Sequence, residues 1–337
     1  MNFTATQARN ILITGGAGFI GSHLAALHAG KGDQVTVVDD LSTGEREVLN
    51  GLPKDRVRFI EADLLTCPEL PREVAIADRI YHMAAVVGML RVLKEPIEVT
   101  RVNVLGTELL LETVAASGHL PEIVIASSSS VYSHAKDDEL TEETELVYAP
   151  EKGGLTGYAL SKLTNEIQAG AYRKVHGLPI AIPRFFNAIG PRQTGSYGFV
   201  LPRFIAQALS GAPLTVYGDG TQTRSFCDVR DTVAAIDLLA SCPEAWGIPV
   251  NVGNQREITI LDLAHLVIER ACSSSPVTFV SYEEAYGGSF WQVTQRRPSI
   301  ARLHALTGFT PSWTLEQTID DLIARNRDHN PEGGRLQ

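Results

Sequence analysis

Short apolar runs and helical patterns alternate along the first half of the chain. Six runs predict strands at residues 10–14, 34–38, 57–60, 78–82, 122–126 and 178–183. Apolar residues at helical spacing predict helices at 19–31, 97–117 and 158–176. Strands that alternate with helices form βαβ units and a parallel sheet, and continuous apolar runs are typical of strands buried on both faces. The pattern therefore predicts an α/β fold.

The pattern changes after about Phe185. Residues 187–198 are rich in Gly, Pro and Ser and predict loops. Helices are then predicted at 200–209 and 229–240, and strands at 214–217 and 249–252. We expect two domains. The first comprises residues 1–184, to which segments near 229–252 return, and the second is a smaller α/β domain at 185–330.

Composition and charge narrow the classes of partner. The 337 residues include 29 Lys and Arg against 39 Asp and Glu, which gives a net charge of −10. Such a chain lacks the broad basic surface that nucleic-acid binding requires, so we expect no nucleic-acid partner. An acidic chain can still bind a phosphorylated small molecule through a local pocket of Arg side chains and backbone N–H groups.

No feature of the sequence predicts a membrane or secreted protein. No run approaches the roughly 18 apolar residues that span a bilayer, and the polar first ten residues lack the apolar stretch of a signal peptide. Cys67, Cys227, Cys242 and Cys272 form no CxxC pair, which is typical of thiols in a reducing compartment. We therefore expect a cytoplasmic protein with no membrane partner.

A glycine-rich loop follows the first predicted strand. Gly15, Gly18 and Gly21 have the spacing GxxGxxG and lead into the helix predicted at 19–31. Glycines there allow a tight turn, a close approach of the backbone to a pyrophosphate, and close packing of helix on strand. The helix N-terminus offers N–H groups to the phosphates. The loop predicts a dinucleotide site on a Rossmann-type, doubly wound parallel sheet.

Acidic positions refine that prediction. Asp39, with Asp40 beside it, follows the second predicted strand, 18 residues after Gly21. A carboxylate there accepts hydrogen bonds from the adenosine ribose and repels a 2′-phosphate, so we expect NAD as the cofactor rather than NADP. Asp63 follows the third predicted strand and either contacts the adenine edge or caps a helix.

Tyr158 and Lys162 form a YxxxK pair on one face of a predicted helix. The phenol of Tyr has a pKa near 10, and a neighbouring ammonium favours the phenolate. Tyr158 can then exchange a proton with a substrate hydroxyl while hydride moves to or from NAD. One of the hydroxyls of Ser127–Ser130, after the preceding strand, can orient the substrate oxygen. The alternative for this segment is a serine-rich turn.

Together these segments resemble the extended short-chain dehydrogenase/reductase family, in particular its NAD-dependent nucleotide-sugar epimerases and dehydratases. The matching stretches run from about residue 9 to 325 and are TGGAGFIGSHL, VVDDLSTG, HMAA, NVLGTELLLE, SSSSVY, YALSK, PRFFNAIGPRQ and PLTVYGDGTQTRSF. The resemblance implies a UDP-sugar substrate and a homodimer formed through helices near 97–117 and 158–176. Leu109, Leu110 and Leu111 are apolar on several sides of the first helix and pack either against a partner or within the subunit.

The resemblance also implies roles for single residues. The family's catalytic Ser or Thr lies three residues before its Val-Tyr pair, so the expected catalytic residues are Ser128, Tyr158 and Lys162. Those expected to hold NAD are Gly15, Gly18, Phe19, Ile20, Gly21, Asp39, Asp40, Asp63, Leu64, Ala84, Tyr158 and Lys162. Those expected to bind the substrate are Ser128, Ser129, Asn187, Arg192, Val200, Leu201, Thr215, Tyr217, Arg224 and Arg297. Of these, Asn187, Arg224 and Arg297 would contact the diphosphate. No metal is expected.

Departures from the family pattern favour one of its branches. Hexose 4,6-dehydratases and UDP-glucuronate decarboxylases have a Glu where this chain has Ser130. We therefore expect an isomerase, a UDP-sugar 4-epimerase, in which Tyr158 removes the O4 proton and hydride returns to the other face of a 4-keto sugar. The sugar stays open between UDP-glucose/galactose and UDP-glucuronate/galacturonate, with N-acetylated sugars as a further alternative. Arg91 or Arg192 would pair with the C6 carboxylate of a hexuronate. The alternatives are a 4,6-dehydratase or UDP-glucuronate decarboxylase and, in another class, a non-catalytic NAD-binding sensor.

Overall fold

An eight-stranded parallel sheet is the centre of the fold. The computed structural model describes residues 8–133, 135, 137–148, 155–193, 198–286 and 297–329. The strand order is β12-β7-β5-β4-β1-β2-β3, with β6 paired to β7, and every pairing is parallel. The strands are β1 (Asn10–Thr14), β2 (Gln34–Asp39), β3 (Val57–Glu61), β4 (Arg79–His82), β5 (Glu122–Ile125), β6 (Ser127–Ser128), β7 (Ile180–Phe185) and β12 (Pro249–Val252). The predicted Rossmann-type α/β fold is confirmed.

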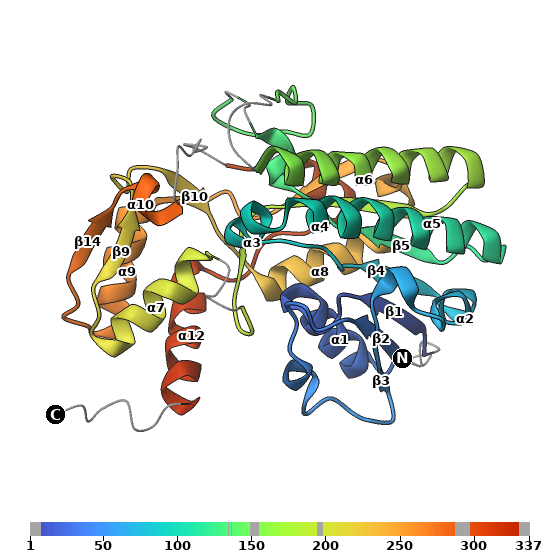
Figure 1. Ribbon diagram of the computed structural model, residues 1–337, viewed down its shortest axis with the longest axis horizontal. Helices are drawn as coiled ribbons and strands as arrows, with labels where there is room; N and C mark the ends of the chain where they lie inside the picture. Colours follow the sequence, from blue (N-terminus) through green and yellow to red (C-terminus); the bar gives the residue numbers. More distant parts are fainter. Residues whose placement is uncertain are drawn as a thin grey trace.

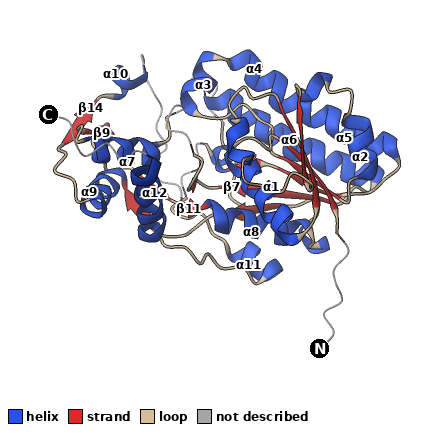
Figure 2. Cartoon of the chain, turned by 90° about the horizontal axis from the view of Figure 1, so that it is seen from below, coloured by secondary structure: helices blue, strands red, loops and turns tan. Residues whose placement is uncertain are grey.

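Helices cover both faces of this sheet (Figures 1 and 2). The helices on one face are α1 (Phe19–Lys31), α8 (Val229–Ala240) and α11 (Ala301–Thr307), and those on the other are α2 (Leu70–Ile76), α5 (Gly106–Ser117) and α6 (Leu155–His176). Successive residues of β1 alternate between the two cores: Ile13 packs on the α1 side and Leu12 on the α5 side, both fully buried. The continuous apolar runs of the sequence are explained by this two-sided burial.

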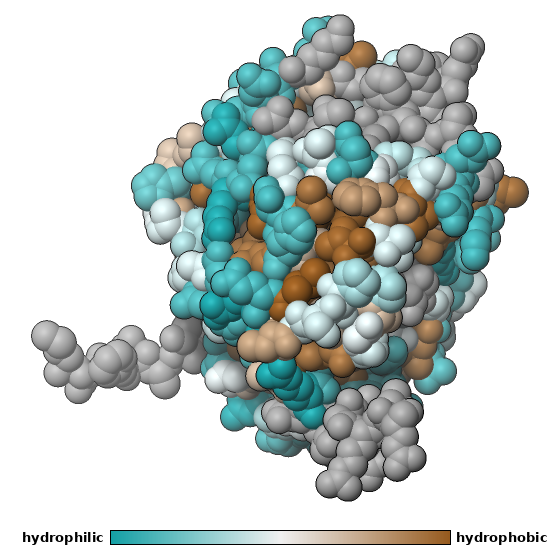
Figure 3. Space-filling model, turned by 90° about the vertical axis from the view of Figure 1, so that its left-hand side faces the viewer, coloured by the Kyte–Doolittle hydropathy of each residue, from teal (hydrophilic) through white to brown (hydrophobic). Residues whose placement is uncertain are grey.

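A separate hydrophobic core lies in the smaller part of the molecule, at the left in Figure 1. It is formed by α7 (Val200–Ser210), α9 (Ile260–Ala271), α12 (Leu315–His329) and the parallel pair β9 (Leu214–Tyr217) and β14 (Val277–Val280). The remaining short elements after β7 are β8 (Ala188–Ile189), β10 (Thr223–Ser225), β11 (Cys227–Asp228), β13 (Glu257–Thr259) and α10 (Tyr282–Tyr286). The 3₁₀ turns of the described residues are Arg46–Leu49, Leu64–Thr66, Ser129–Tyr132 and Pro243–Ala245. Figure 3 looks onto this end, where polar side chains surround apolar atoms near the middle of the face.

Later segments of the chain return to the large sheet. β12 pairs with β7, and α8 packs against α1. Leu303 of α11 and Phe309 join the same core, although the sequence predicted a return only near 229–252. The division into domains 1–184 and 185–330 stays a prediction.

The helix predicted at 97–117 is continuous in the structure, but it contains a π-helical turn that the sequence did not predict. α3 (Met89–Lys94) and α4 (Pro96–Thr100) lead into a π-helical turn at Arg101–Leu105, and only then does α5 begin. Asn103 lies in the wide turn with its side chain buried. Its Oδ1 accepts the backbone N–H of Val86 at 2.8 Å, and its Nδ2 donates to Ser161 Oγ at 3.1 Å. Through Asn103, the π-helical turn therefore holds the segment after β4 against α6. Helical periodicity in the sequence does not encode such a long-range contact.

Leu110 and Leu111 are fully buried within the chain, in the core between α5 and the sheet. Of the two arrangements left open for them, packing within the subunit is the one observed.

No helix in the described ranges is long and apolar enough to cross a bilayer. All four cysteines are free. The cytoplasmic location stays a prediction.

Charged and phenolic groups at the start of the strands join β4, β5 and α8. The guanidinium of Arg79 donates to Tyr81 Oη at 3.0 Å and to the carboxylates of Glu122 and Asp237. Tyr81 Oη donates to Asp237 Oδ1 at 2.9 Å. Although burial alone would raise it, the pKa of Asp237 lies well below its usual range because His28, Lys31 and Arg79 stabilise the carboxylate. We call Arg79, Tyr81, Glu122 and Asp237 the amino-end network.

Candidate active site

One cavity of about 820 Å³ runs between the large sheet and the smaller part of the molecule. Its walls come from the carboxyl ends of β1, β2, β4 and β6, from α6, and from segments after β7. The order of the strands reverses between β1 and β4, the place where ligands bind in open α/β sheets. The predicted site residues that line this cavity are Gly15, Gly18, Phe19, Ile20, Gly21, Asp39, Asp40, Asp63, Leu64, Ala84, Ser128, Ser129, Tyr158, Lys162, Asn187, Arg192, Val200, Leu201, Tyr217 and Arg224.

Two predicted substrate residues do not line the cavity. Thr215 engages α7: its Oγ1 accepts from Gln207 Nε2 at 3.1 Å. Arg297 has its Nε 3.8 Å from Glu257 Oε2, while its carbonyl accepts the N–H of Leu140. The structure therefore does not bring Thr215 and Arg297 to the other candidates, because each is held by a neighbour that the local motif did not reveal.

The glycine loop is tight enough to exclude side chains. Gly15 has φ +70°, and a Cβ there would lie 2.5 Å from the backbone nitrogen of Ala84. A Cβ at Gly21 would overlap the carbonyl oxygen of Gly15 and lie 2.7 Å from the Cα of Gly16. Gly18 precedes α1 with no side-chain cap, so the first N–H groups of the helix face the cavity end of the loop. This cradle fits a pyrophosphate.

Asp39 joins the end of β2 to the glycine loop. Its carboxylate accepts the N–H of Leu41 at 2.8 Å and that of Ala17 at 2.9 Å. Burial raises the pKa of Asp39, and these two hydrogen bonds oppose the shift. A 2′-phosphate at this position would meet the carboxylates of Asp39 and Asp40, so the pocket fits the free ribose hydroxyls of NAD.

Asp63 caps a turn, which is one of the two roles that its position allowed, and the contact with adenine stays a prediction. Its Oδ1 accepts the N–H of Leu65 at 2.9 Å and caps the turn Leu64–Thr66. Its Oδ2 lies 3.5 Å from Arg101 Nη2, at the cavity wall. Arg101 also donates Nε to Glu98 at 2.9 Å. Glu98 and Arg101 were not predicted from the sequence, because they reach this end of the cavity only through the packing of α4 and the π-helical turn.

Lys162 is buried behind Tyr158 on α6. Its Nζ donates to the carbonyl of Ala126 at 2.9 Å, and burial lowers its pKa to about 8. Ser128, two residues after Ala126, accepts the N–H of Ser130 at 3.1 Å through Oγ. The phenol of Tyr158, the ammonium of Lys162 and the hydroxyl of Ser128 thus line the same cavity. These groups can together move a proton to or from a substrate oxygen.

His82 lies beneath this group and stays neutral. Burial, with a smaller effect from the charge of Lys162, lowers its pKa to about 3. Its ring nitrogens contact Thr14 Oγ1 at 2.7 Å and Thr107 Oγ1 at 3.1 Å. His82 therefore adds no second positive charge beside Lys162.

Three arginines from the C-terminal half line the opposite wall. Arg192 has φ +68°, donates Nη1 to the carbonyl of Ser22 at 3.0 Å, and is an exposed residue. The guanidinium of Arg203 lies 4.0 Å above the ring of Tyr217, and Arg224 donates to its own strand. Guanidinium groups suit diphosphates and carboxylates, so this wall can hold an anionic substrate within a chain of net negative charge.

Sequence analysis also missed Arg203 and Gln222. Gln222 donates Nε2 to the carbonyl of Tyr217 at 3.1 Å, while its buried Oε1 has no partner among the described residues. Its place two residues before Arg224 in an extended segment was an available signal, because alternate residues share a side. Arg203 gave no such signal, since α7 reaches the cavity only through the packing of the smaller part.

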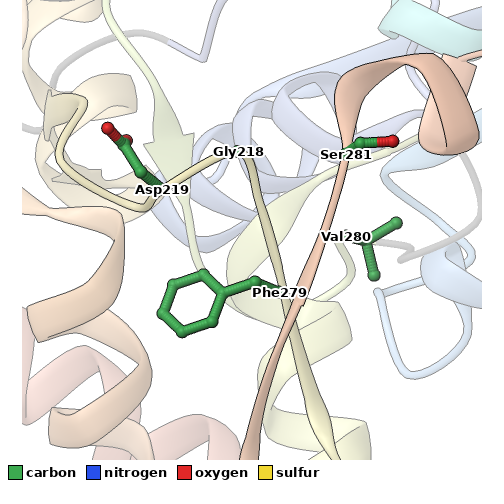
Figure 4. Close-up of a pocket in the computed structure, with 5 residues that line it drawn as sticks. All are labelled: Gly218, Asp219, Phe279, Val280 and Ser281. Atoms are coloured by element: carbon green, nitrogen blue, oxygen red, sulfur yellow. The ribbon is translucent and has the colours of Figure 1, made fainter.

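A second depression of about 580 Å³ lies on the outer side of β9 and β14 (Figure 4). Its lining residues are Gly218, Asp219, Phe279, Val280 and Ser281. The carboxylate of Asp219 already accepts the N–H and the hydroxyl of Thr221, at 3.0 and 2.7 Å. The depression is thus formed by a turn and the exposed ring of Phe279, and none of its lining residues also lines the main cavity.

We expect Gly21→Ala to lose bound NAD, because the new methyl overlaps the Gly15 carbonyl. Overpacking costs about 1–3 kcal/mol, which corresponds to roughly tenfold or more in affinity. The measurement is the NAD content of the purified protein. Gly30→Ala is the matched control, since it lies in the same helix with no atom within 4 Å of the new Cβ. Equal NAD contents in the two variants would contradict the assigned cradle.

Comparisons with known proteins agree with this geometry. The model of the NAD dependent epimerase/dehydratase family matches residues 11–253. The UDP-N-acetyl-alpha-D-glucosaminuronate decarboxylase of Bacillus cytotoxicus is 33% identical, over 94% of this chain and 97% of that protein. The UDP-glucuronic acid decarboxylase 1 of Xenopus tropicalis is also 33% identical, over 94% of this chain and 71% of that protein. The structure of an epimerase from Methanothermobacter thermautotrophicus superposes with a TM-score of 0.86 at 26% identity, covering 96% of this chain and 94% of that one.

The expectation of an isomerase is wrong. Relatives that are 32–33% identical over most of this chain are named decarboxylases. Ser130 does not exclude that class, since loss of CO₂ from a β-keto acid needs no carboxylate side chain. With its parallel sheet, its glycine cradle and the match over residues 11–253, the chain belongs to the NAD-dependent epimerase/dehydratase family, and NAD is its cofactor.

Proposed function

We propose that the protein is an NAD-dependent decarboxylase of UDP-hexuronates of the UDP-glucuronate class. The observation that carries this proposal is that one cavity is lined both by Ser128, Tyr158 and Lys162 and by arginines from the C-terminal half. The names of relatives one third identical over 94% of the chain support the same reaction class.

The first step is oxidation of the sugar at C4. Gly15, Gly18 and Asp39 hold NAD, which when bound accepts a hydride from C4 and later returns it. Tyr158, as the phenolate, takes the proton from O4, and Ser128 donates a hydrogen bond to the same oxygen. Lys162 favours the phenolate through its positive charge.

The second step is loss of CO₂ from the oxidised sugar. With a ketone at C4, the C6 carboxylate belongs to a β-keto acid. The C5–C6 bond breaks, CO₂ leaves, and the electron pair forms an enolate whose charge lies on O4. Ser128 and the now protonated Tyr158 stabilise that oxygen by hydrogen bonds. Solvent supplies the proton to C5, so Ser130 is compatible with the reaction.

We propose Arg192 as the partner of the C6 carboxylate. Arg91 already pairs with Glu95, Nε to Oε2 at 2.8 Å. Within the described ranges Arg192 has no carboxylate at ion-pair distance, and it remains a cation although burial lowers its pKa. The proposed contacts to the rest of the substrate are Asn187 and Arg224 for the diphosphate, and Val200, Leu201 and Tyr217 for the base.

The reaction is tested with UDP-glucuronate and UDP-N-acetylglucosaminuronate labelled with ¹³C at C6. We expect labelled CO₂ and a UDP-pentose, followed by NMR without added reductant. Tyr158→Phe should lower the rate by about 10³-fold, because the proton acceptor is lost. Tyr172→Phe is the matched control, since Tyr172 lies on the same helix but bonds Glu108. Retention of the label in every nucleotide-sugar product would exclude the decarboxylase.

The rate should also depend on the charge of Lys162. Its pKa of about 8 means that the ammonium is present below that pH and lost above it. We expect the rate of C4 oxidation to fall as the pH rises through about 8. Lys162→Arg should be slower but lack this descending limb, because a guanidinium stays charged. An unchanged limb in Lys162→Arg would assign it to another group.

We further propose that the protein forms a homodimer through α4, α5 and α6, which lie together on one side of the molecule (Figure 1). Ile97 is 79% exposed, Leu105 53% and Ile167 63%. Burial of such side chains against a second copy would be favourable.

Ile167→Glu should weaken self-association about tenfold or more, because a carboxylate would be buried at the interface. Light scattering over a dilution series measures the mass. Leu238→Glu, at a 44% exposed position of α8, is the control and should leave the mass unchanged. Equal masses for both variants at every concentration would place the interface elsewhere.

A further inference from the structure

A buried ion pair lies beside Ser128 and is not part of the mechanism above. Glu166 follows Lys162 by one turn of α6 and Tyr158 by two, so all three share a helix face. Lys162 Nζ bonds the carbonyl of Ala126, and the carboxylate of Glu166 accepts the hydroxyl of Ser127. Two successive turns of α6 are thus fastened to the two residues that precede Ser128.

Arg184 completes the pair from the neighbouring strand. It stands opposite Ser127 in the register of β6 and β7. Its Nε and Nη2 donate to the two oxygens of Glu166 at 2.8 and 2.7 Å, and the side chains are only 4% and 8% exposed. A two-pronged contact of this kind fixes direction as well as distance.

The same guanidinium reaches the residues that follow Ser128. Nη1 of Arg184 donates to Tyr132 Oη at 2.8 Å, and Tyr132 ends the turn Ser129–Tyr132. Tyr132 Oη in turn donates to Asn251 Oδ1 of β12 at 2.7 Å. Ser128 is therefore fixed on its amino side through Ser127 and on its carboxyl side through Tyr132.

We infer that Glu166, Arg184 and Tyr132 are positioning residues that set the place of the Ser128 hydroxyl relative to Tyr158. The inference rests on the roles proposed for Ser128 and Tyr158. Two groups that act on one oxygen must both lie within hydrogen-bond reach of it, and a shift of about 1 Å is enough to lose much of their effect. Neither Glu166 nor Tyr132 lines the cavity, so their effect is exerted through Ser128.

The amino-end network supplies a matched control within the same sheet. There too an arginine, Arg79, joins a glutamate and a tyrosine hydroxyl, and Tyr81 Oη donates to a further acceptor. Both tyrosines are nearly fully buried, and none of the four residues of that network lines the cavity. Tyr132→Phe deletes the hydrogen bonds to Arg184 and Asn251 next to Ser128. Tyr81→Phe deletes the corresponding pair to Arg79 and Asp237, and a third hydrogen bond to His28 Nε2 at 2.9 Å, away from Ser128.

The experiment compares these variants in a single turnover. UDP-glucuronate is mixed with the NAD-loaded protein, and reduction of the bound nicotinamide is followed by stopped-flow absorbance. We expect Tyr132→Phe to slow reduction about tenfold or more at saturating substrate, with the KM and the NAD content changed less than about twofold. Tyr81→Phe should stay within about twofold of the wild type, although it loses one hydrogen bond more and should lower Tm at least as much as Tyr132→Phe.

Arg184 provides a second test that survives poor folding of Tyr132→Phe. Arg184→Lys keeps the charge but loses the two-pronged contact, so it should restore the Tm of Arg184→Met without restoring the rate of nicotinamide reduction. Rates for Tyr132→Phe and Tyr81→Phe within about twofold of each other would overturn the inference, as would full recovery of the rate in Arg184→Lys.

The outcome is separable from that of the proposed function. If the wild type reduces its bound nicotinamide but releases no CO₂, the decarboxylase fails and the positioning test still stands. If UDP-glucuronate gives no reduction, the ionisation of Tyr158 is measured as the ultraviolet difference between each protein and its Tyr158→Phe form. A shift in that pKa for Tyr132→Phe beyond that for Tyr81→Phe supports the inference, and equal values overturn it.

Discussion

The hydrogen bond from the buried Lys162 ammonium to the carbonyl of Ala126 joins the two parts of the cavity wall to which we assign catalysis. Lys162 belongs to the helix that carries Tyr158, and Ala126 precedes the strand residue Ser128. An ammonium removed from water must keep such a partner or lose its proton, and the pKa of about 8 expresses that balance. The neutral state of His82 follows from the same burial, since a second cation beside Lys162 would be unfavourable.

The second constraint is the distribution of charge along the cavity. The carboxylates of Asp39, Asp40 and Asp63 gather where β2 and β3 end, whereas Arg192, Arg203 and Arg224 come from the segments after β7. Ribose hydroxyls donate to carboxylates, and diphosphates accept from guanidiniums. A chain of net charge −10 can therefore hold a dinucleotide and an anionic substrate together. The local arrangement of charged side chains, and not the net charge of the chain, determines which groups bind where.

The absence of a Glu at position 130 is weak evidence about the reaction class. Ser130 argues against decarboxylation because the family resemblance implies a Glu at that place, yet relatives named as decarboxylases are one third identical over most of this chain. A β-keto acid supplies its own driving force once C4 is oxidised, so the protein needs only to stabilise O4 and to admit a proton. The groups that carry out the shared oxidation were therefore better guides than the residue that was absent.

The sequence by itself determined the features that depend on near neighbours. The strands β1–β5, the helix α1, the glycine loop and the pairing of Tyr158 with Lys162 follow from runs, turns and spacings of a few residues, and the structure has the predicted elements within a few residues of their expected ends. Tertiary structure alone decided the π-helical turn around Asn103, the return of α11 to the large sheet, and the positions of Arg203, Thr215 and Arg297. It also decided the pairing of Glu166 with Arg184, 18 residues apart, and of Tyr132 with Asn251, 119 residues apart. Each of these depends on which distant strands and helices meet, and a local pattern of apolar and polar residues carries no record of a partner that the chain reaches only after folding.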